Sequence, residues 1–312
     1  PSKNGRDRSS FFDAFPMEFP GCNTGDYRES AIEVLDGKNH NGVEIVYQGH
    51  RIFAGKPTLN GLPATFGVSG DSMTLEIYGA DKTLELEVML RYSIFEDVDV
   101  VARSVSVKNV SEEPVFLTRL MSASLDMDME PVLENYRLLT LHGSWARERH
   151  MEFREIGRGK VSVGSTRGES SHQEHPFMAL VSEKADQENG SVYGFHFVYS
   201  GNFIAQVERT QFDSLRVQMG IHPKNFCWQL KPGESFEAPE VILTYSACGL
   251  GGMSRNLHDL YRNHLIRSPY KDKKRPILIN NWEATYFDFN TEKLLDIARE
   301  AKKAGIEMLV MD

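Results

Sequence analysis

The chain has 312 residues, 40% of them hydrophobic and 25% charged, a composition typical of a soluble globular protein with one large domain or two ordinary ones. It carries 35 basic and 44 acidic residues, a net charge of -9, which argues against nucleic acid or an anionic membrane as a partner. No apolar run approaches the roughly 20 residues of a membrane span, and the N-terminus lacks the apolar core of a signal peptide.

Residues 1–30 are predicted to form a loop-like segment that packs on the following β domain or on a neighbouring subunit. Pro16, Pro20, Gly21 and Gly25 interrupt any long helix or strand in this segment.

Residues 31–246 are predicted to be strands. Runs such as TLELEVMLRY at 83–92, SLRVQM at 214–219 and EVILTY at 240–245 are separated by turn signals. Many strands without helical crossovers predict antiparallel sheets. Because about 200 residues are many for a simple sandwich, we expect an extended double-sheet structure.

The pattern changes to a helical linker over residues 247–275. CGLGG at 248–252 is interpreted as a flexible joint, and Ser254 as the N-cap of a helix whose apolar stripe runs from Leu257 to Leu265. The charged run YKDKKR at 270–275 is expected to join this helix to the next domain.

Residues 276–312 are predicted to form a strand, a helix and a second, parallel strand. Two apolar runs without alternation, 276–281 and 306–311, are typical of buried parallel strands. Between them, Thr291 is predicted to cap an amphipathic helix that Gly305 ends. Two parallel strands cannot bury their edges, so we expect the sequence to stop inside a larger domain.

Trp282 and Asp312 follow the two predicted parallel strands, at the edge where α/β sheets and barrels bind ligands. An indole that packs on a pyranose and a carboxylate that accepts from hydroxyl groups suggest a sugar site. The residues alone leave open a packing tryptophan and a helix-capping aspartate. Glu283 is not expected to share the pocket, because successive strand residues point to opposite faces.

No metal or cofactor is predicted. His172 and His175 have an HxxH spacing, but Pro176 breaks any helical face and no third ligand is near in sequence. Cys22, Cys227 and Cys248 are far apart without CxxC spacing, which predicts buried thiols in a reducing, cytoplasmic compartment.

The sequence resembles the bacterial α-galactosidases, or melibiases, of the glycosidase group related to raffinose synthases. The resemblance covers nearly the whole chain and rests on these segments: DRSS at 7–10, TGDYRE at 24–29, GHRIFAGKPTLNGLPAT at 49–65, GSWARER at 143–149, RGESSHQEHPF at 167–177, VYSGNF at 198–203, LKPGESFEAPEV at 230–241, and PILINNWEATYFDFNTEKLLDIA followed by GIEMLVMD at the end.

The resemblance implies a mainly β fold: an antiparallel β-supersandwich at 31–246, the linker at 247–275 and the first βαβ unit of a (β/α)8 barrel at 276–312. It implies substrate-binding roles for Trp282 and Asp312, a place for Asn202 near the barrel mouth, and an Arg8 that reaches the active site of an adjacent subunit in a tetramer. The family nucleophile and acid/base aspartates lie in later motifs that this sequence does not contain.

The resemblance therefore implies retaining hydrolysis of terminal α-1,6-linked galactose from melibiose- and raffinose-type oligosaccharides, without a cofactor. No catalytic residue lies within these 312 residues, so the chain by itself is expected to be an inactive fragment. A non-catalytic carbohydrate-binding or structural β-sandwich module is the alternative.

Overall fold

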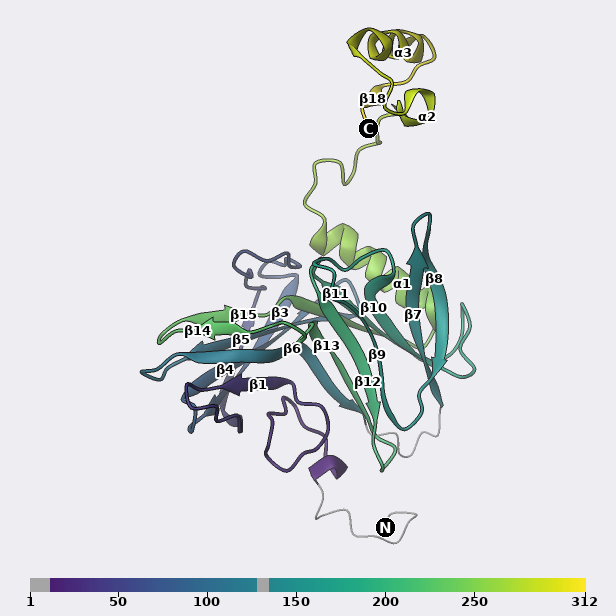
Figure 1. Ribbon diagram of the computed structural model, residues 1–312. Helices are drawn as coiled ribbons and strands as arrows, with labels where there is room; N and C mark the ends of the chain where they lie inside the picture. The colour runs from purple at the N-terminus through teal and green to yellow at the C-terminus, as the bar shows by residue number, and fades with distance from the viewer. Residues whose placement is uncertain (1–11, 128–134) are drawn as a thin grey trace. The chain divides into compact units, whose positions relative to one another are not determined.

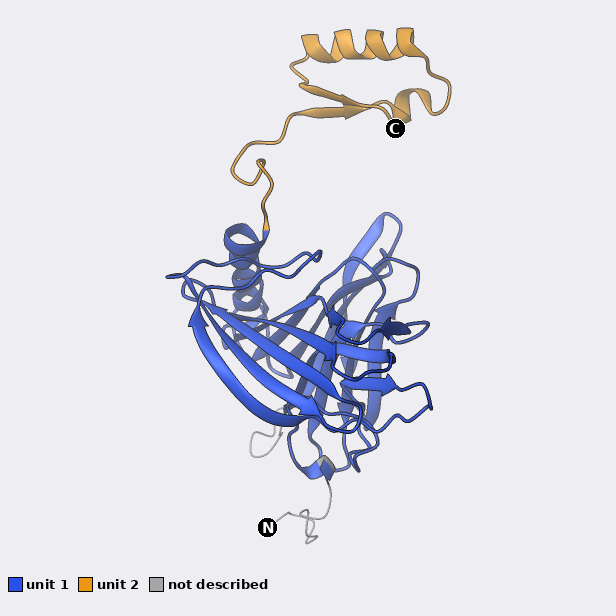
Figure 2. Cartoon of the chain, turned by 90° about the vertical axis from the view of Figure 1, so that its left-hand side faces the viewer, with its two compact units in different colours: residues 1–265 blue, residues 266–312 orange. Residues whose placement is uncertain are grey.

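The computed structural model of the protein describes residues 12–127 and 135–312. The chain divides into two compact units, residues 1–265 and 266–312 (Figure 2). The larger unit consists of two antiparallel sheets with a helix, and the smaller one is a single strand-helix-strand motif (Figure 1).

The smaller sheet of the large unit has six strands in the order β1-β6-β13-β12-β9, with β14 also paired to β6. Its strands are β1 (Ile32–Leu35), β6 (Val115–Met127), β9 (Gly159–Ser165), β12 (Phe203–Arg209), β13 (Leu215–Ile221) and β14 (Trp228–Leu230).

The larger sheet has ten strands in the order β2-β3-β4-β5-β16-β11-β10-β7-β8, with β15 also paired to β5. They are β2 (Val46–Ala54), β3 (Ser72–Asp81), β4 (Leu86–Phe95), β5 (Val100–Asn109), β7 (Tyr136–Ser144), β8 (Arg147–Glu155), β10 (Glu174–Ser182), β11 (Val192–Val198), β15 (Ser235–Glu237) and β16 (Glu240–Ser246). In the middle of this sheet, β5 pairs with a strand from the far end of the domain, with Arg103 opposite Val241.

The predicted mainly β, antiparallel double-sheet fold is confirmed. The sequence did not single out the hairpin of β7 and β8, because β8 is exposed along nearly its whole length and so has no apolar alternation. The same reason applies to β2, an edge strand whose side chains are mostly exposed on both faces.

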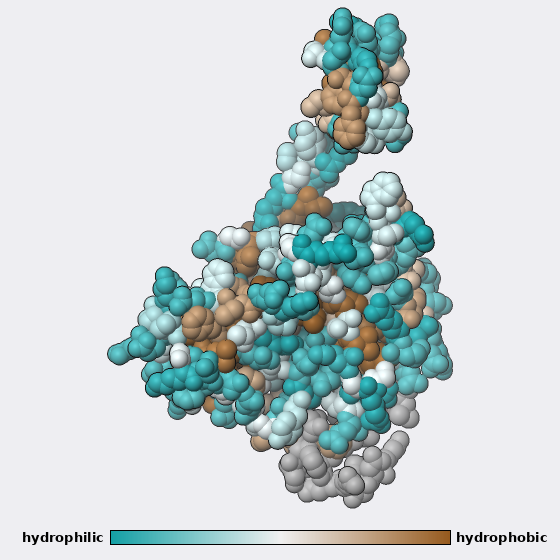
Figure 3. All heavy atoms as spheres, viewed as in Figure 1, coloured by the Kyte–Doolittle hydropathy of each residue, from teal (hydrophilic) through white to brown (hydrophobic). Residues whose placement is uncertain are grey.

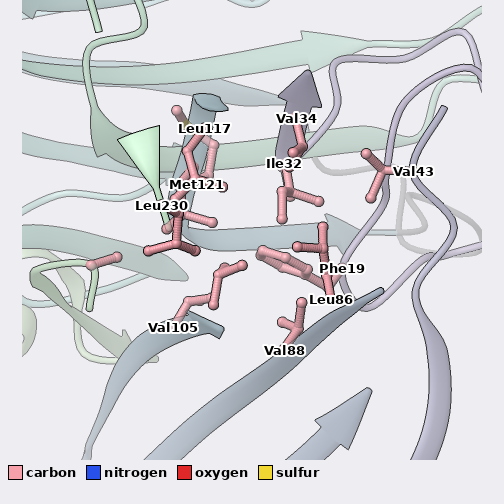
Figure 4. Packing of buried hydrophobic residues seen from close by; sticks show 14 of the residues in the cluster. Phe19, Ile32, Val34, Val43, Leu86, Val88, Val105, Leu117, Met121 and Leu230 are labelled. Atoms are coloured by element: carbon pink, nitrogen blue, oxygen red, sulfur yellow. The ribbon is translucent and has the colours of Figure 1, made fainter. Parts of the chain in front are cut away.

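Apolar side chains from the two sheets meet in two cores. In the first, Leu86, Val88 and Val105 of the ten-stranded sheet face Leu117, Met121 and Ile32 of the six-stranded sheet (Figure 4). In the second, Phe195 and Phe197 of β11 pack with Phe203 and Met219. Burial of such alternate residues, worth roughly 1.5–3 kcal/mol for each large side chain, holds the sheets together.

Helix α1 (Gly249–Leu260) covers the other face of the ten-stranded sheet. Its Leu250, Met253 and Leu257 pack on a third buried cluster that includes Ala102 and Ile242. The helix continues into a π-helical turn, Tyr261–Leu265. The expectation of a flexible CGLGG joint and a Ser254 N-cap is therefore wrong: the helix begins within the glycines, because only glycine permits the close contacts there.

Those contacts are tight. A Cβ on Gly252 would lie 2.2 Å from the Ser246 hydroxyl, and one on Gly249 would lie 2.4 Å from the Asp186 carbonyl oxygen. Gly249 also has φ +64°, a conformation that glycine adopts without a steric cost. The glycines thus let the start of α1 approach the 182–191 loop and the end of β16.

Buried ion pairs fix residues 12–30 on the six-stranded sheet. The Asp26 carboxylate contacts both Arg28 and Arg216 at 2.9 Å, and Asp126 contacts Arg216 at 2.7 Å. The side chains of all four residues are at most 4% exposed. Arg28 also donates to the carbonyl oxygens of Phe12 and Phe15. Paired in this way, the charges compensate one another inside the protein.

The smaller unit contains β17 (Leu278–Asn280), α2 (Trp282–Thr285), α3 (Thr291–Lys303) and β18 (Met308–Val310), and the two strands are parallel. The predicted strand-helix-strand motif is confirmed. The N-cap of α3 is Asn290 rather than Thr291, since the Asn290 side chain accepts from the Lys293 amide at 3.0 Å. Gly305, with φ +84°, ends the helix, and Ile306 N–H donates back to the Ala301 carbonyl oxygen.

The cysteines differ from the prediction of buried thiols. All three are free, but Cys227 and Cys248 are exposed and Cys22 is half-buried, because they lie in turns and at a helix start rather than in the apolar cores. Among the residues that the structure describes, no helix is long and apolar enough to cross a membrane.

Candidate functional site

Trp282 and Asp312 follow the carboxyl ends of the parallel strands β17 and β18. In the register of these strands Asn280 lies opposite Val310, so each strand ends just before one of the two predicted site residues. Trp282 is the first residue of α2 and is half-buried, whereas Asp312 is exposed.

Two asparagines join Trp282 to Asp312. The Asn280 side chain accepts from the Trp282 N–H at 2.6 Å and donates to the Asp312 carboxylate at 3.0 Å. The fully buried Asn281 accepts from the Asp312 N–H at 2.8 Å and donates to the Thr285 hydroxyl at 2.9 Å. The site depends on this asparagine clasp, Asn280 and Asn281, which fixes one end of the Asp312 carboxylate and leaves its other oxygen to accept from a ligand.

The asparagine clasp was not predicted from the sequence. The signal was present as two polar residues between an apolar run and Trp282, at the strand end where such side chains meet a neighbouring strand.

Three aromatic rings gather at the same rim. Trp282 contacts Phe287 edge to face at 4.8 Å and Tyr286 at 5.5 Å between ring centroids. Tyr286 has φ +47°, a conformation that costs a non-glycine residue on the order of 1–3 kcal/mol. The turn after α2 therefore accepts backbone strain and holds two further aromatic rings beside the indole.

An aromatic ring beside a fixed carboxylate is an arrangement suited to a sugar ring, whereas cleavage of a glycosidic bond makes a further demand. A retaining glycosidase needs two carboxyl groups about 5–5.5 Å apart. At this rim, within the part of the chain that the structure describes, Asp312 is the carboxylate that the hydrogen bonds hold in place, and Glu283 is an exposed residue of α2.

Asn202 lies in the larger unit, in the turn between β11 and β12. Its side chain accepts from the Gly168 N–H at 2.6 Å, and nearby Ser170 N–H donates to the Ser200 carbonyl oxygen at 2.8 Å. These bonds connect VYSGNF at 198–203 to RGESSHQEHPF at 167–177. Asn202 thus orients a loop, and the amide nitrogen of its side chain makes no hydrogen bond to the described residues.

The same loop forms one side of a polar pocket of about 770 Å³. Arg149 and Ser171, with φ near +60°, line it from opposite segments. The remaining lining residues are Leu141, Glu148, Glu169, Ser170, His172 and His175. The segments GSWARER and RGESSHQEHPF therefore meet at one pocket.

His175, which lines this pocket, stacks on His196, with ring centroids 6.0 Å apart. Burial, followed by the charge of Arg149, lowers the pKa of His175, and burial lowers the pKa of His196 to about 4. Tyr261 of the π-helical turn shares a 2.8 Å hydrogen bond with His196 Nδ1. Both shifts favour the neutral form of the imidazole. Within residues 12–127 and 135–312, no group of three metal-binding side chains occurs.

Arg8 lies outside the described residues. The structure thus brings Trp282 and Asp312 together at one rim, whereas Asn202 lies in the larger unit and binds the 167–177 segment.

Comparison with known proteins gives one family. Residues 1–231 match the glycosyl hydrolase family 36 N-terminal domain, and residues 235–312 match the melibiase domain. The chain is 46% identical to α-galactosidase AgaA of Geobacillus stearothermophilus, over 100% of this chain and 42% of that protein. It is 40% identical to the bifunctional α-galactosidase/sucrose kinase AgaSK of Mediterraneibacter gnavus, over 100% of this chain and 33% of that protein.

Solved structures agree. A crystal structure of a Geobacillus stearothermophilus AgaA variant in complex with stachyose superposes with a TM-score of 0.93 at 46% identity, covering 100% of this chain and 43% of that one. The galactosidase domain of AgaSK superposes with a TM-score of 0.94 at 40% identity, covering 100% of this chain and 43% of that one. The chain therefore spans less than half the length of the relatives that it matches.

Proposed function

Because this chain belongs to glycosyl hydrolase family 36, we propose that it is the N-terminal part of an α-galactosidase that removes terminal α-1,6-linked galactose from melibiose- and raffinose-type oligosaccharides. The observation that carries the proposal is the asparagine clasp, which holds the Trp282 backbone and the Asp312 carboxylate at one rim. In this proposal Trp282 packs on the galactose ring and Asp312 accepts hydrogen bonds from its hydroxyl groups.

The reaction is a double displacement by two carboxyl groups with retention, and it needs no cofactor. In this proposal residues 31–246 are the β domain, 247–275 the linker and 276–312 the start of a (β/α)8 barrel whose later strands carry the nucleophile and the acid/base residue. The complex of an AgaA variant with stachyose supports the choice of substrate class.

The proposal includes the oligomeric state of the protein and its location in the cell. In this proposal Arg8 reaches the substrate site of an adjacent subunit in a homotetramer, and Asn202 is a further substrate-binding residue. Three free cysteines, two of them exposed, support a reducing cytoplasmic location.

Replacement of Asp312 tests the proposal. In the full-length protein, Asp312→Asn removes a charged acceptor, and we expect kcat/KM for raffinose to fall roughly 10- to 100-fold, mainly through KM. Glu283→Gln is the matched control, because Glu283 is an exposed carboxylate of the adjacent helix α2. Equal kinetics for the wild type and Asp312→Asn would remove Asp312 from the substrate site.

A further inference from the structure

The larger unit has a second concave surface, distinct from the polar pocket around His175. It has a volume of about 780 Å³ and lies where β14 and β15 meet the 60–62 loop. Figure 3 shows apolar side chains reaching the surface on the side where Figure 1 places β14 and β15. We call it the aromatic pocket, after four of its lining residues, Tyr199, Phe226, Trp228 and Phe236.

Trp228 gives this pocket its character. It is 50% exposed, although an indole of its size gains free energy from burial. Phe236 packs against it at 5.2 Å between ring centroids, and Phe226 packs on Phe236 at 5.8 Å. Strand pairing of Trp228 with Leu117 of β6 fixes its backbone. The indole is thus supported by its neighbours while half of its surface stays accessible.

Polar groups surround the rings. Within the described part of the chain, the side chains of Asn60, Ser106 and Ser235 make no hydrogen bond to the protein, although all three line the pocket. Glu237 accepts from the Asn60 N–H at 2.9 Å and so holds the loop against β15. Donors and acceptors therefore stand beside a supported aromatic surface.

This combination selects the class of ligand. A purely apolar ligand would leave the amide and hydroxyl groups without partners, which costs free energy. A phosphate or another anion would meet the Glu237 carboxylate, and no Lys or Arg lines the pocket, although Arg91 lies 3.9 Å from the other side of that carboxylate. A neutral pyranose has an apolar C–H face for Trp228 and equatorial hydroxyl groups for the polar side chains.

We propose that the aromatic pocket is an auxiliary carbohydrate-binding site for one pyranose unit of a neutral oligosaccharide, formed by residues of the larger unit alone. The choice of an α-galactoside as the probe rests on the proposed function. The site would hold oligosaccharide substrate on the β domain without taking part in bond cleavage.

The three tryptophans allow a direct test, because they report on three different places. The chain is labelled with 5-fluorotryptophan, its three ¹⁹F resonances are assigned by single Trp→Phe variants, and raffinose is titrated in. Trp228 reports on the aromatic pocket, Trp282 on the proposed galactose rim, and Trp145, which is 85% exposed at the β7–β8 turn, is the control. Glycerol, which has no ring face, controls for solvent effects.

We expect the Trp228 resonance to shift saturably with a Kd on the order of millimolar, as one sugar ring provides, while Trp145 does not shift. Trp228→Ala should weaken raffinose binding to this unit at least about tenfold, and Trp145→Ala should leave it unchanged. If the Trp228 resonance shows no saturable shift with raffinose up to about 100 mM, the proposal is overturned.

The readouts separate this inference from the proposed function. A saturable shift of Trp282 without one of Trp228 overturns the auxiliary site and supports the galactose rim. A Trp228 shift in a full-length protein without α-galactosidase activity supports the auxiliary site and overturns the proposed function.

Discussion

Asn280 is the residue on which the geometry of the candidate galactose rim depends. Its one side chain serves both neighbours, accepting from the Trp282 N–H and donating to the Asp312 carboxylate. A residue that acts through two others is a positioning residue. Its effect should appear in substrate binding rather than in the proton transfers of the reaction.

Asn280→Ala should therefore raise KM for raffinose in the full-length enzyme. The Asp312 carboxylate loses its only hydrogen bond from a side chain among the described residues, so we expect an increase of roughly 5- to 20-fold with a smaller change in kcat. The pH profile of kcat should stay in place, because Asn280 does not titrate. A shifted profile would mean that Asn280 acts on a catalytic carboxyl group instead.

The buried Asp26 carboxylate should stabilise the folded protein. Arg28 and Arg216 share two buried carboxylates, Asp26 and Asp126, and replacement of Asp26 by Asn removes one of these two counter-charges. Breaking a buried pair in this way costs on the order of 3 kcal/mol in the free energy of unfolding, measured by urea denaturation. Asp259→Asn, which removes an exposed ion pair with Arg262, is the control and should change little.

The same variant gives a pH test. Burial by itself raises the pKa of Asp26, but the hydrogen bond from Arg28 and the charge of Arg216 outweigh it and hold the pKa below its usual value. Because the folded-state pKa is lowered, the stabilisation is complete above the unfolded-state pKa near 3.9 and is lost as the pH falls through the folded-state pKa. The stability difference between wild type and Asp26→Asn should hence be largest at pH 7 and shrink below about pH 4. A difference that stays constant down to pH 2 would contradict this account.

At the scale of elements, the start of α1 shows how the β domain ends. Gly249 combines a positive φ with close contacts to the 182–191 loop, so that the helix lies against the sheet from its first residue. The apolar stripe of α1 then reaches the cluster around Ile242. A helix that began at Ser254 would lack the first turn of this packing.

Gly249→Ala should destabilise the chain by about 2–4 kcal/mol in urea denaturation. About 1 kcal/mol comes from the left-handed conformation, and the rest comes from the 2.4 Å approach to the Asp186 carbonyl oxygen. Gly233→Ala isolates the first contribution, because Gly233 has φ +78° but nothing within 4 Å of an added Cβ. Equal losses for the two variants would show that packing at Gly249 plays no part.

At the scale of the whole molecule, we expect the chain by itself to lack α-galactosidase activity. This 312-residue chain should not hydrolyse a chromogenic α-galactoside, since a double displacement needs two carboxyl groups and the proposed function assigns both to later strands of the barrel. The full-length protein under the same conditions is the positive control. Turnover by the chain above the background rate would place a catalytic pair within it.

The fold could be predicted from the sequence wherever one face of an element is buried. Strands β4 and β16 and helix α3 carry regular apolar patterns and were predicted, whereas β2 and β8 are mostly exposed on both faces and carry none. The start of α1 was missed because glycines there serve packing across the chain, which local propensity does not record.

For the candidate site, the placement of Trp282 and Asp312 could be predicted, because both follow apolar runs typical of parallel strands and the carboxyl ends of such strands meet at one edge of a sheet. The asparagine clasp did not follow, because hydrogen bonds between two strands depend on their register, and residues 280 and 312 are far apart in the sequence. The contact between the 167–177 segment and Asn202 escaped prediction for the same reason.

The pairing of β5 with β16 has a consequence for synthesis of the chain. Strands β2 to β5 form a meander of consecutive neighbours, but the partner of β5 begins about 130 residues later, at Glu240. At a translation rate of about 5–20 residues per second, the β5 edge waits roughly 7–26 seconds for that partner. During this interval a nascent chain exposes an unpaired strand edge at the centre of its future sheet, and such an edge can pair with another chain before its own partner is made.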